Sequence, residues 1–413
     1  MSQCQEASTK SRRNFIKKGF AGLAGAAILP SAIKGKPKAH AKGTEKKRKM
    51  IYRTLGKTGL KLPVVNMGVM NADNPNLVKA ALDAGILLLD TAWYYQRGRN
   101  EEMIGEVIKG RPRDSYVIAT KIWEPRDWQT ALFPEDAKAD TFIAKFETSL
   151  KRLGLDYVDI LHLHNISRKE SVLFEPYVES LKKFKKQGKA RFIGISTHRN
   201  EPEIIRTAAE SKIYDVVLTS YNFKQEHRED VKKAIAYAAK AGLGIIAMKP
   251  LAGVYWDREK QYPINVKAAL KWVLQDKNVH TTIPGFTTFD QMEVDLSVME
   301  DLTLTREEKA DLKPPEKLSM AKSTAGFYCQ QCEKCLPQCP AKLEIPTLMR
   351  SYMYAYGYRN LQISRQTLDF LDLTDIACRK CRVCKVKCAM GFDIKERILD
   401  IARIKDIPED FLA

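Results

Sequence analysis

The sequence predicts an α/β protein in which a (β/α)8 TIM barrel is followed by a small, mainly helical domain that is rich in cysteine. Short apolar strands alternate with helical stretches from residue 51 to about residue 315, and eight of the nine cysteines lie beyond residue 316. The chain has 413 residues and is 44% hydrophobic, which suffices for two or three domains with a sizeable core. We expect four parts: a signal (1–41), a basic linker (42–50), the barrel (51–315) and the cysteine-rich domain (316–413).

The N-terminal segment has the order of a secretory signal. A basic stretch that contains Arg12 and Arg13 precedes an apolar run over 19–33, and Ala39-His40-Ala41 follows as a small-x-small cleavage pattern. The apolar run is too short to span a bilayer well. Adjacent arginines resemble a twin-arginine signal, the type that exports folded proteins. We therefore expect a bacterial periplasmic protein with no stable membrane span after cleavage, or a cytoplasmic one if this segment is only a disordered basic tail.

The positive charge of the chain does not predict a nucleic-acid partner. The formal net charge is +19, but +7 of it lies in residues 1–41. The remaining charge is dispersed, apart from the basic residues 46–49 and a basic stretch over 182–189. We interpret the second stretch as a solvated helix face. Because no DNA- or RNA-binding motif accompanies these charges, we exclude nucleic acid.

Eight apolar, β-branched runs account for the predicted barrel. They are Val64–Val69, Ile86–Leu89, Tyr116–Ala119, Val158–Leu163, Phe192–Ile195, Val216–Leu218, Leu243–Ala247 and Val279–Ile283. Strands that alternate with helices imply a parallel sheet, and eight such units over about 265 residues fit a closed barrel. The active site of such a barrel lies at the carboxyl ends of its strands.

Polar residues at these strand ends predict carbonyl–alcohol chemistry. Asp90 and Tyr95 follow the second strand, Lys121 the third and His164 the fourth. A nearby Lys⁺ stabilises a phenolate, so we expect Lys121 to lower the pKa of Tyr95, with Asp90 anchoring the lysine. His164 is expected to hold the substrate oxygen. Tyr94 is expected to pack, and His198 is a minor candidate.

Several segments resemble the aldo-keto reductases, and the resemblance covers residues 51 to about 310. The matching segments are 52–60, Asp90-Thr91-Ala92 with Tyr95, Gly98–Glu102, Lys121 after 117–120, Asp156–Asp159 with His164, 193–196 and Ile283–Gly285. The resemblance implies hydride transfer between NAD(P)H and a carbonyl or alcohol substrate, with Tyr95 as general acid/base.

The resemblance also implies a set of cofactor-binding residues: Ser196, Thr197, Tyr221, Met248, Lys249 and Gly285. The loop over 285–291 lacks the Lys or Arg that often holds the 2′-phosphate of NADP, so NAD and NADP both remain open. Leu218 stands where the family often has a glutamine, and Met248 where it often has an aromatic side chain.

The cysteines form two runs with nearly the same spacing, and this spacing predicts two [4Fe–4S] clusters. The fourth cysteine of such a run usually ligates the other cluster. We therefore assign Cys329, Cys332, Cys335 and Cys388 to one cluster, and Cys378, Cys381, Cys384 and Cys339 to the other. Zinc sites more often use two wider-spaced pairs or include histidine, and disulfides suit smaller secreted scaffolds. The long spacer over 340–377 resembles an α-helical ferredoxin, and aldo-keto reductases with such a C-terminal segment form a known subgroup.

These features predict an iron–sulfur oxidoreductase of the aldo-keto reductase type. We expect a small carbonyl or alcohol substrate, with the clusters relaying electrons to or from a redox partner protein. Two alternatives remain: an electron-transfer or redox-sensing protein with a non-catalytic barrel, and an enzyme whose clusters are purely structural.

Overall fold

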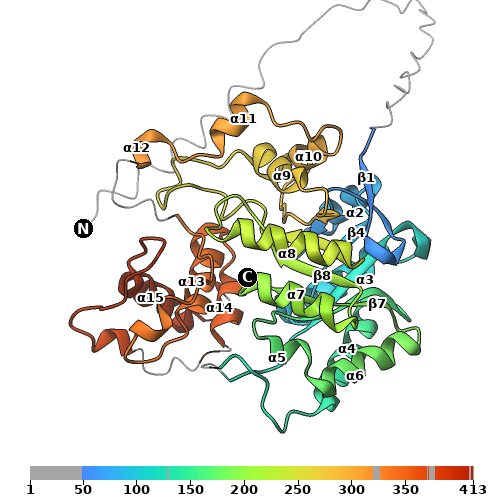
Figure 1. Cartoon of the computed structure of the whole chain (residues 1–413), viewed down its shortest axis with the longest axis horizontal. Helices are drawn as coiled ribbons and strands as arrows, with labels where there is room; N and C mark the ends of the chain where they lie inside the picture. Colours follow the sequence, from blue (N-terminus) through green and yellow to red (C-terminus); the bar gives the residue numbers. More distant parts are fainter. Residues whose placement is uncertain are drawn as a thin grey trace, which may run out of the picture. The chain divides into compact units, whose positions relative to one another are not determined.

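Eight parallel strands form the barrel, which confirms the predicted fold class (Figure 1). The computed structural model describes residues 49–127, 130–319, 326–369, 371, 377–408 and 411–412, so the predicted signal lies outside the described residues. Each strand pairs with the next in chain order, and a bridge from Val65 to Thr282 brings the two ends of the sheet together. The strands are β3 (Met67–Gly68), β4 (Leu88–Asp90), β5 (Val117–Ile122), β6 (Val158–Leu163), β7 (Ala190–Thr197), β8 (Val216–Ser220), β9 (Gly244–Met248) and β10 (Thr281–Thr282).

Helices connect the strands and bury their apolar faces against the sheet. Side-chain caps fix several of their starts; for example, Asn74 accepts a hydrogen bond from the backbone N of Asn76 (3.0 Å) at the head of the first helix. The helices are α2 (Pro75–Asp83), α3 (Arg99–Ile108), α4 (Ala139–Leu153), α5 (Lys169–Val172), α6 (Glu175–Lys186), α7 (Glu201–Ser211), α8 (Arg228–Lys240), α9 (Val266–Gln275), α10 (Phe289–Val298) and α11 (Arg306–Asp311). None of the helices in the described ranges has the length and apolar character needed to cross a bilayer.

A hairpin closes the amino-terminal end of the barrel. Its strands, β1 (Tyr52–Thr54) and β2 (Lys61–Pro63), pair in antiparallel fashion. The side chains of Leu55 and Leu62 are buried in the same cluster as residues from inside the barrel. Gly56 has φ of +52°, and a Cβ there would lie 2.4 Å from the backbone N of Gly244, so only glycine fits. The open end of the barrel is therefore the opposite one, where the strands finish.

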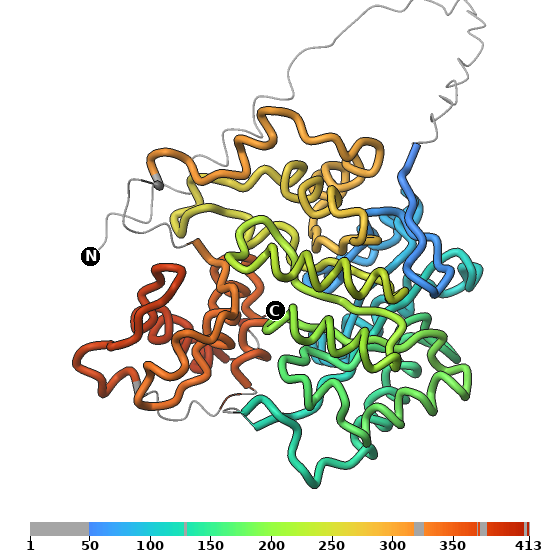
Figure 2. Tube along the Cα trace, in the orientation of Figure 1, coloured from blue at the N-terminus to red at the C-terminus, as the bar shows by residue number. Residues whose placement is uncertain are grey.

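The C-terminal region is mainly helical, as predicted. Its helices are α12 (Glu316–Ser319), α13 (Ile345–Tyr352), α14 (Leu361–Asp369) and α15 (Ile394–Ala402). The last three gather in one group, whereas α12 lies nearer to α11 (Figure 1 and Figure 2). A π-helical turn, η5 (Met353–Gly357), continues directly from α13. Side chains four residues apart lie near one face of an α-helix, and they also do so in a π-turn, which holds slightly more than four residues.

The barrel and the C-terminal region share a buried core and a set of polar contacts. Phe223 and Trp256 from barrel loops belong to the same apolar cluster as Phe327 and Leu348. Asn360 Nδ2 donates to Asn71 Oδ1 (3.0 Å), a residue just past the first barrel strand.

Arg199, just past β7, is the central polar contact between the two parts. It forms ion pairs with Glu333 (3.2 Å) and Glu344. Burial disfavours its charge, but these two carboxylates raise the pKa of Arg199 overall. The C-terminal region thus covers the carboxyl end of the barrel.

Candidate active site

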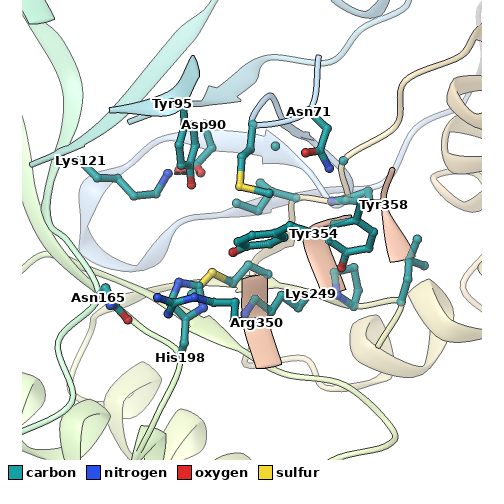
Figure 3. A pocket seen from close by; sticks show the side chains of 18 of the residues that line it. Asn71, Asp90, Tyr95, Lys121, Asn165, His198, Lys249, Arg350, Tyr354 and Tyr358 are labelled. Carbon is teal, nitrogen blue, oxygen red and sulfur yellow. Dashed lines mark hydrogen bonds and ion pairs between the residues drawn. The ribbon is translucent and has the colours of Figure 1, made fainter. Parts of the chain in front are cut away.

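A cavity lies at the carboxyl ends of the barrel strands, and all four predicted catalytic residues line it. Figure 3 labels three of them, Asp90, Tyr95 and Lys121. Most of the cavity wall comes from the barrel, and the remainder comes from the C-terminal region. Its lining residues include Asn71, Asp90, Tyr94, Tyr95, Lys121, His164, Asn165, His198, Met248, Lys249, Ile283, Pro284, Gly285, Arg350, Tyr354 and Tyr358.

Asp90 and Lys121 form a buried ion pair on adjacent strands. Lys121 Nζ donates to Asp90 Oδ1 (2.5 Å) and to the backbone oxygen of Thr91 (2.6 Å). Asp90 of β4 pairs with Ala119 of β5, and Lys121, two residues further along β5, points to the same face of the sheet as Ala119. Burial raises the pKa of Asp90 and lowers that of Lys121, and their mutual attraction opposes both shifts. The predicted anchoring of Lys121 by Asp90 is present in this geometry.

Tyr95 is presented by a loop with unusual backbone geometry. Gln96 and Arg97 directly after it have φ of 51° and 57°, in the left-handed region. Buried side chains of the following segment hold this loop: Gln96 Nε2 donates to Ala72 O (3.1 Å), and Asn100 Nδ2 donates to Val69 O (2.8 Å). Gln96 and Asn100 therefore fix the tyrosine loop to the backbone just past β3.

The proton of Tyr95 is held more tightly than the sequence predicted. Lys121 Nζ lies 5.0 Å from the centre of the tyrosine ring, but its hydrogen bonds go to Asp90 and Thr91. Burial, with further contributions from Tyr94 and Asp90, raises the pKa of Tyr95 well above its usual value. The expectation of a lowered pKa is wrong for this state, because desolvation outweighs the attraction of a nearby cation, Arg350. The phenol is thus the form present at neutral pH.

His164 follows β6 and is neutral in this site. Burial and the charges of Lys121 and Arg126 hold its pKa well below the usual range. Its ring stacks on Tyr94, with centroids 5.2 Å apart, and lies edge-on to Tyr95 at 6.2 Å. Tyr94 packs against a neighbouring side chain, as expected. That neighbour is the catalytic candidate His164, and the side chain of Tyr94 also lines the cavity.

These pKa shifts predict a flat pH profile for carbonyl reduction. The raised pKa of Tyr95 keeps its proton in place below pH 10, and His164 stays neutral above its lowered pKa. We expect kcat for reduction to change by less than about twofold between about pH 6 and pH 9. Alcohol oxidation needs the tyrosinate and should rise about tenfold per pH unit over the same interval. Steady-state rates in both directions measure this, and a reduction rate that halves near pH 8 contradicts it.

Three of the six predicted cofactor-binding residues line the cavity, namely Met248, Lys249 and Gly285. The other three lie outside the lining. Ser196 Oγ accepts a hydrogen bond from the backbone N of Asn165 (2.8 Å), and Thr197 Oγ1 donates to Arg199 O (2.8 Å). Tyr221 packs against Trp272, with ring centroids 5.1 Å apart, in the layer between sheet and helices.

The structure adds residues that the sequence analysis did not select. Arg350, Tyr354 and Tyr358 reach the cavity from α13 and the π-turn of the C-terminal region. Their spacing of four residues is the only sequence signal for them, and it is shared by many buried helix faces. Figure 3 shows Arg350, Lys249 and His198 across the cavity from Tyr95, Asp90 and Lys121.

The eight C-terminal cysteines line two neighbouring cavities in the described part of the chain. One is bordered by Cys329, Cys332, Cys335 and Cys388. The other is bordered by Cys339, Cys378, Cys381 and Cys384. Each cavity therefore takes three cysteines from one run and one from the other, and Ile345 and Ile394 border both.

The donor set of these cavities suits a cluster better than a single ion. No three Cys, His, Asp or Glu side chains among the described residues converge closely enough to hold one metal ion. In a [4Fe–4S] cubane each thiolate binds its own iron, so the four sulfurs stand around a cavity rather than around a point. Burial raises the pKa of Cys329 and Cys378 to about 11, so these thiols need a cationic partner to ionise.

Comparison with known proteins agrees with this geometry. The model of the "Aldo/keto reductase family" matches residues 65–267. A Schizosaccharomyces pombe protein named "Putative aryl-alcohol dehydrogenase" is 30% identical over 240 residues, which are 49% of this chain and 68% of that protein. The chain belongs to the aldo/keto reductase family. An "L-galactose dehydrogenase" of Arabidopsis thaliana is 28% identical over 296 residues, 62% of this chain and 89% of the relative.

The fold and the cysteine-rich region of this aldo/keto reductase also have known counterparts. An aldo-keto reductase from Bacillus halodurans has a similar fold, with a TM-score of 0.52 and 22% identity over 64% of this chain and 95% of that one. A "4Fe-4S dicluster domain" matches residues 328–393, which include all eight cysteines. The protein is thus an aldo/keto-reductase-like oxidoreductase that carries a 4Fe–4S dicluster domain.

Proposed function

We propose that this protein is an NAD(P)-dependent oxidoreductase that reduces a carbonyl group, or oxidises the matching alcohol, and that two [4Fe–4S] clusters connect it to a redox partner. The observation that carries the proposal is that Asp90, Tyr95, Lys121 and His164 line one cavity. A barrel that only bound a ligand would not require a buried ion pair beside a phenol and a neutral imidazole.

The residues of the cavity suit the transfer of one proton. Tyr95, protonated at neutral pH, is the acid for the carbonyl oxygen in reduction. His164, being neutral, can place a hydrogen bond on the same oxygen without adding charge. The Asp90–Lys121 pair supplies a fixed dipole beside the ring, and burial strengthens this electrostatic effect.

The cavity also fits the reactive end of a nicotinamide cofactor. Met248, Ile283 and Pro284 give an apolar wall, and Asn165 and Lys249 border the same space with polar groups. When bound, the cofactor supplies the hydride and the clusters supply one-electron transfer. Neither NAD nor NADP is favoured, since 285–291 contains no Lys or Arg.

The second cysteine cavity lies at a basic surface that suits an acidic redox partner. Arg382, Val383 and Lys385 border this cavity, and Val383 is 79% exposed. Residues 377–392 contain no Asp or Glu. Complementary charge accelerates encounter between electron carriers, so a small acidic carrier protein is the partner that this surface favours.

The relatives suggest the class of substrate. Their names refer to L-galactose, L-glyceraldehyde 3-phosphate and aryl alcohols, which share a carbonyl or hydroxyl beside a polyol or an aromatic ring. We infer a small aldehyde, ketone or alcohol as the substrate. The twin-arginine-like pattern over 1–41 supports a periplasmic location for the working protein, with its cofactors inserted before export.

One anaerobic experiment tests both halves of this function. The holoprotein, with its iron counted and any retained nicotinamide identified by native mass spectrometry, is reduced and then mixed with NAD⁺ or NADP⁺. We expect the clusters to reoxidise as about one nicotinamide per chain becomes reduced, because two clusters deliver one electron each. Supplying the electrons through an acidic carrier protein should give a rate that falls as ionic strength rises.

The possible results separate the proposal from its alternatives. NAD(P)H-dependent carbonyl reduction without any electron exchange with the clusters means that the clusters are structural. Cluster chemistry without carbonyl reduction or nicotinamide binding means that the barrel is not catalytic. Insertion of one cluster or of none contradicts the assignment of the eight cysteines.

A further inference from the structure

Arg350 brings a positive charge from the C-terminal region into the barrel cavity. It lies in the last turn of α13, and the π-turn that follows carries Tyr354 and Tyr358 to the same cavity. Its charge acts on the catalytic groups, since it is among the influences on the pKa of both Tyr95 and His164. Arg350 therefore lies close to the place where substrate chemistry is expected.

The charges around the cavity are unbalanced. Its lining contains three basic side chains, Lys121, Lys249 and Arg350, and one carboxylate, Asp90. Asp90 is already bonded to Lys121. The charge of Arg350 thus remains on the side of the cavity opposite Tyr95, beside Lys249, whose pKa burial lowers to about 7 (Figure 3).

No acidic side chain in the described ranges neutralises Arg350. It has neither a hydrogen-bond partner nor an ion-pair partner there, and the same holds for Lys249. Glu344, the residue just before α13, borders an adjoining cavity with Arg350 but is bonded to Arg199 and to Thr347 Oγ1 (3.1 Å). A partly buried guanidinium without a counter-ion has high affinity for an anion, since its planar fork matches a carboxylate.

We propose that Arg350, assisted by Lys249, binds an anionic group of the substrate, and that the enzyme acts on carbonyl compounds that carry a carboxylate. This inference rests on the proposed function and names its substrate class. The C-terminal region then has a second role, because it supplies the specificity residue of the barrel. Tyr354 and Tyr358 form the adjoining wall and restrict the length of the substrate between its anion and its carbonyl.

A matched pair of aldehydes tests this inference in the holoprotein. 4-Formylbenzoate and its methyl ester have the same carbonyl and differ in charge. We expect kcat/KM for the carboxylate to exceed that for the ester by about 10- to 100-fold, the range for a hydrogen bond to a charged group. R350M should remove this preference, so that kcat/KM for the carboxylate falls to about that for the ester measured in the same variant, while the KM for the nicotinamide stays unchanged. R350K should retain part of it, because lysine keeps the charge but loses the fork.

A binding measurement keeps the test independent of turnover. The Kd of benzoate and of benzamide is measured by calorimetry in the wild type, in R350M and in R350K. K277M is the control variant, because Lys277 is exposed between α9 and β10 at the opposite end of the barrel. If R350M binds benzoate more weakly but binds benzamide as the wild type does, the inference is supported. This holds even if the protein reduces neither aldehyde, in which case only the proposed function fails. An unchanged carboxylate preference overturns the inference. An equal loss of kcat/KM for both aldehydes in R350M also overturns the inference, because Arg350 would then support the fold. A higher KM for the nicotinamide alone overturns it as well, because Arg350 would then bind the cofactor phosphates.

Discussion

Replacing Tyr95 with phenylalanine is expected to lower kcat for carbonyl reduction by about 10²- to 10⁴-fold. The change removes the one hydroxyl that the proposal uses as an acid. It keeps the ring, whose centroid lies 5.3 Å from that of Tyr94 and 6.2 Å from that of His164. KM should change little, because the packing surface of the cavity is preserved. NAD(P)H-dependent reduction under single-turnover and steady-state conditions measures the effect.

The control for this variant is Tyr237→Phe. Tyr237 lies on α8 and is 42% exposed, so removing its hydroxyl should leave kcat, thermal stability and iron content as in the wild type. Y95F should match the control in stability and iron content. A Y95F enzyme within about twofold of the wild-type kcat would mean that another group delivers the proton.

Replacing Cys388 with serine is expected to remove the cluster that the other run of cysteines holds. Cys388 belongs to the second run by sequence, yet it borders the cavity of Cys329, Cys332 and Cys335. Loss of one thiolate in four should abolish that cluster and leave about half of the iron and sulfide. Iron and sulfide analysis with electron paramagnetic resonance of the reduced protein measures the result.

Double variants turn this expectation into a test of connectivity. C388S/C332S should retain about half of the iron, because both changes affect one cluster, whereas C388S/C378S should retain almost none. If each run closed its own cluster, the two results would be exchanged. Ala389→Ser adds a hydroxyl beside Cys388 without removing a thiolate and should keep the full iron content.

Much of the barrel follows from local patterns. Buried parallel strands are continuous apolar runs, so the strands around Val158–Leu163 and Val216–Leu218 are visible in the sequence. The carboxyl ends of parallel strands meet at one rim, which is why the sequence alone groups Asp90, Lys121 and His164. The cysteine spacing likewise predicts which cysteines border each cavity, because a tight loop presents three thiols together and directs the fourth away.

Other features depend on contacts between distant segments. Ser196, Thr197 and Tyr221 sit at strand ends, as predicted, yet they lie outside the cavity because their side chains have partners elsewhere in the barrel. The pKa of Tyr95 was predicted with the wrong sign, because the sequence shows the neighbouring lysine but not the depth of burial. Desolvation is a property of everything packed around a group, and no local pattern reports it.

The sequence by itself determined the barrel, the catalytic candidates and the two sets of cysteines, since each depends on periodicity or spacing along a short stretch of chain. Only the tertiary structure decided that α13 and its π-turn cover the carboxyl end of the barrel and place Arg350 opposite Tyr95. That placement comes from the packing of Phe223 and Trp256 on the C-terminal core and from the ion pairs of Arg199. Such contacts join residues far apart in the chain, and it is their sum that decides which face of a helix meets the active site.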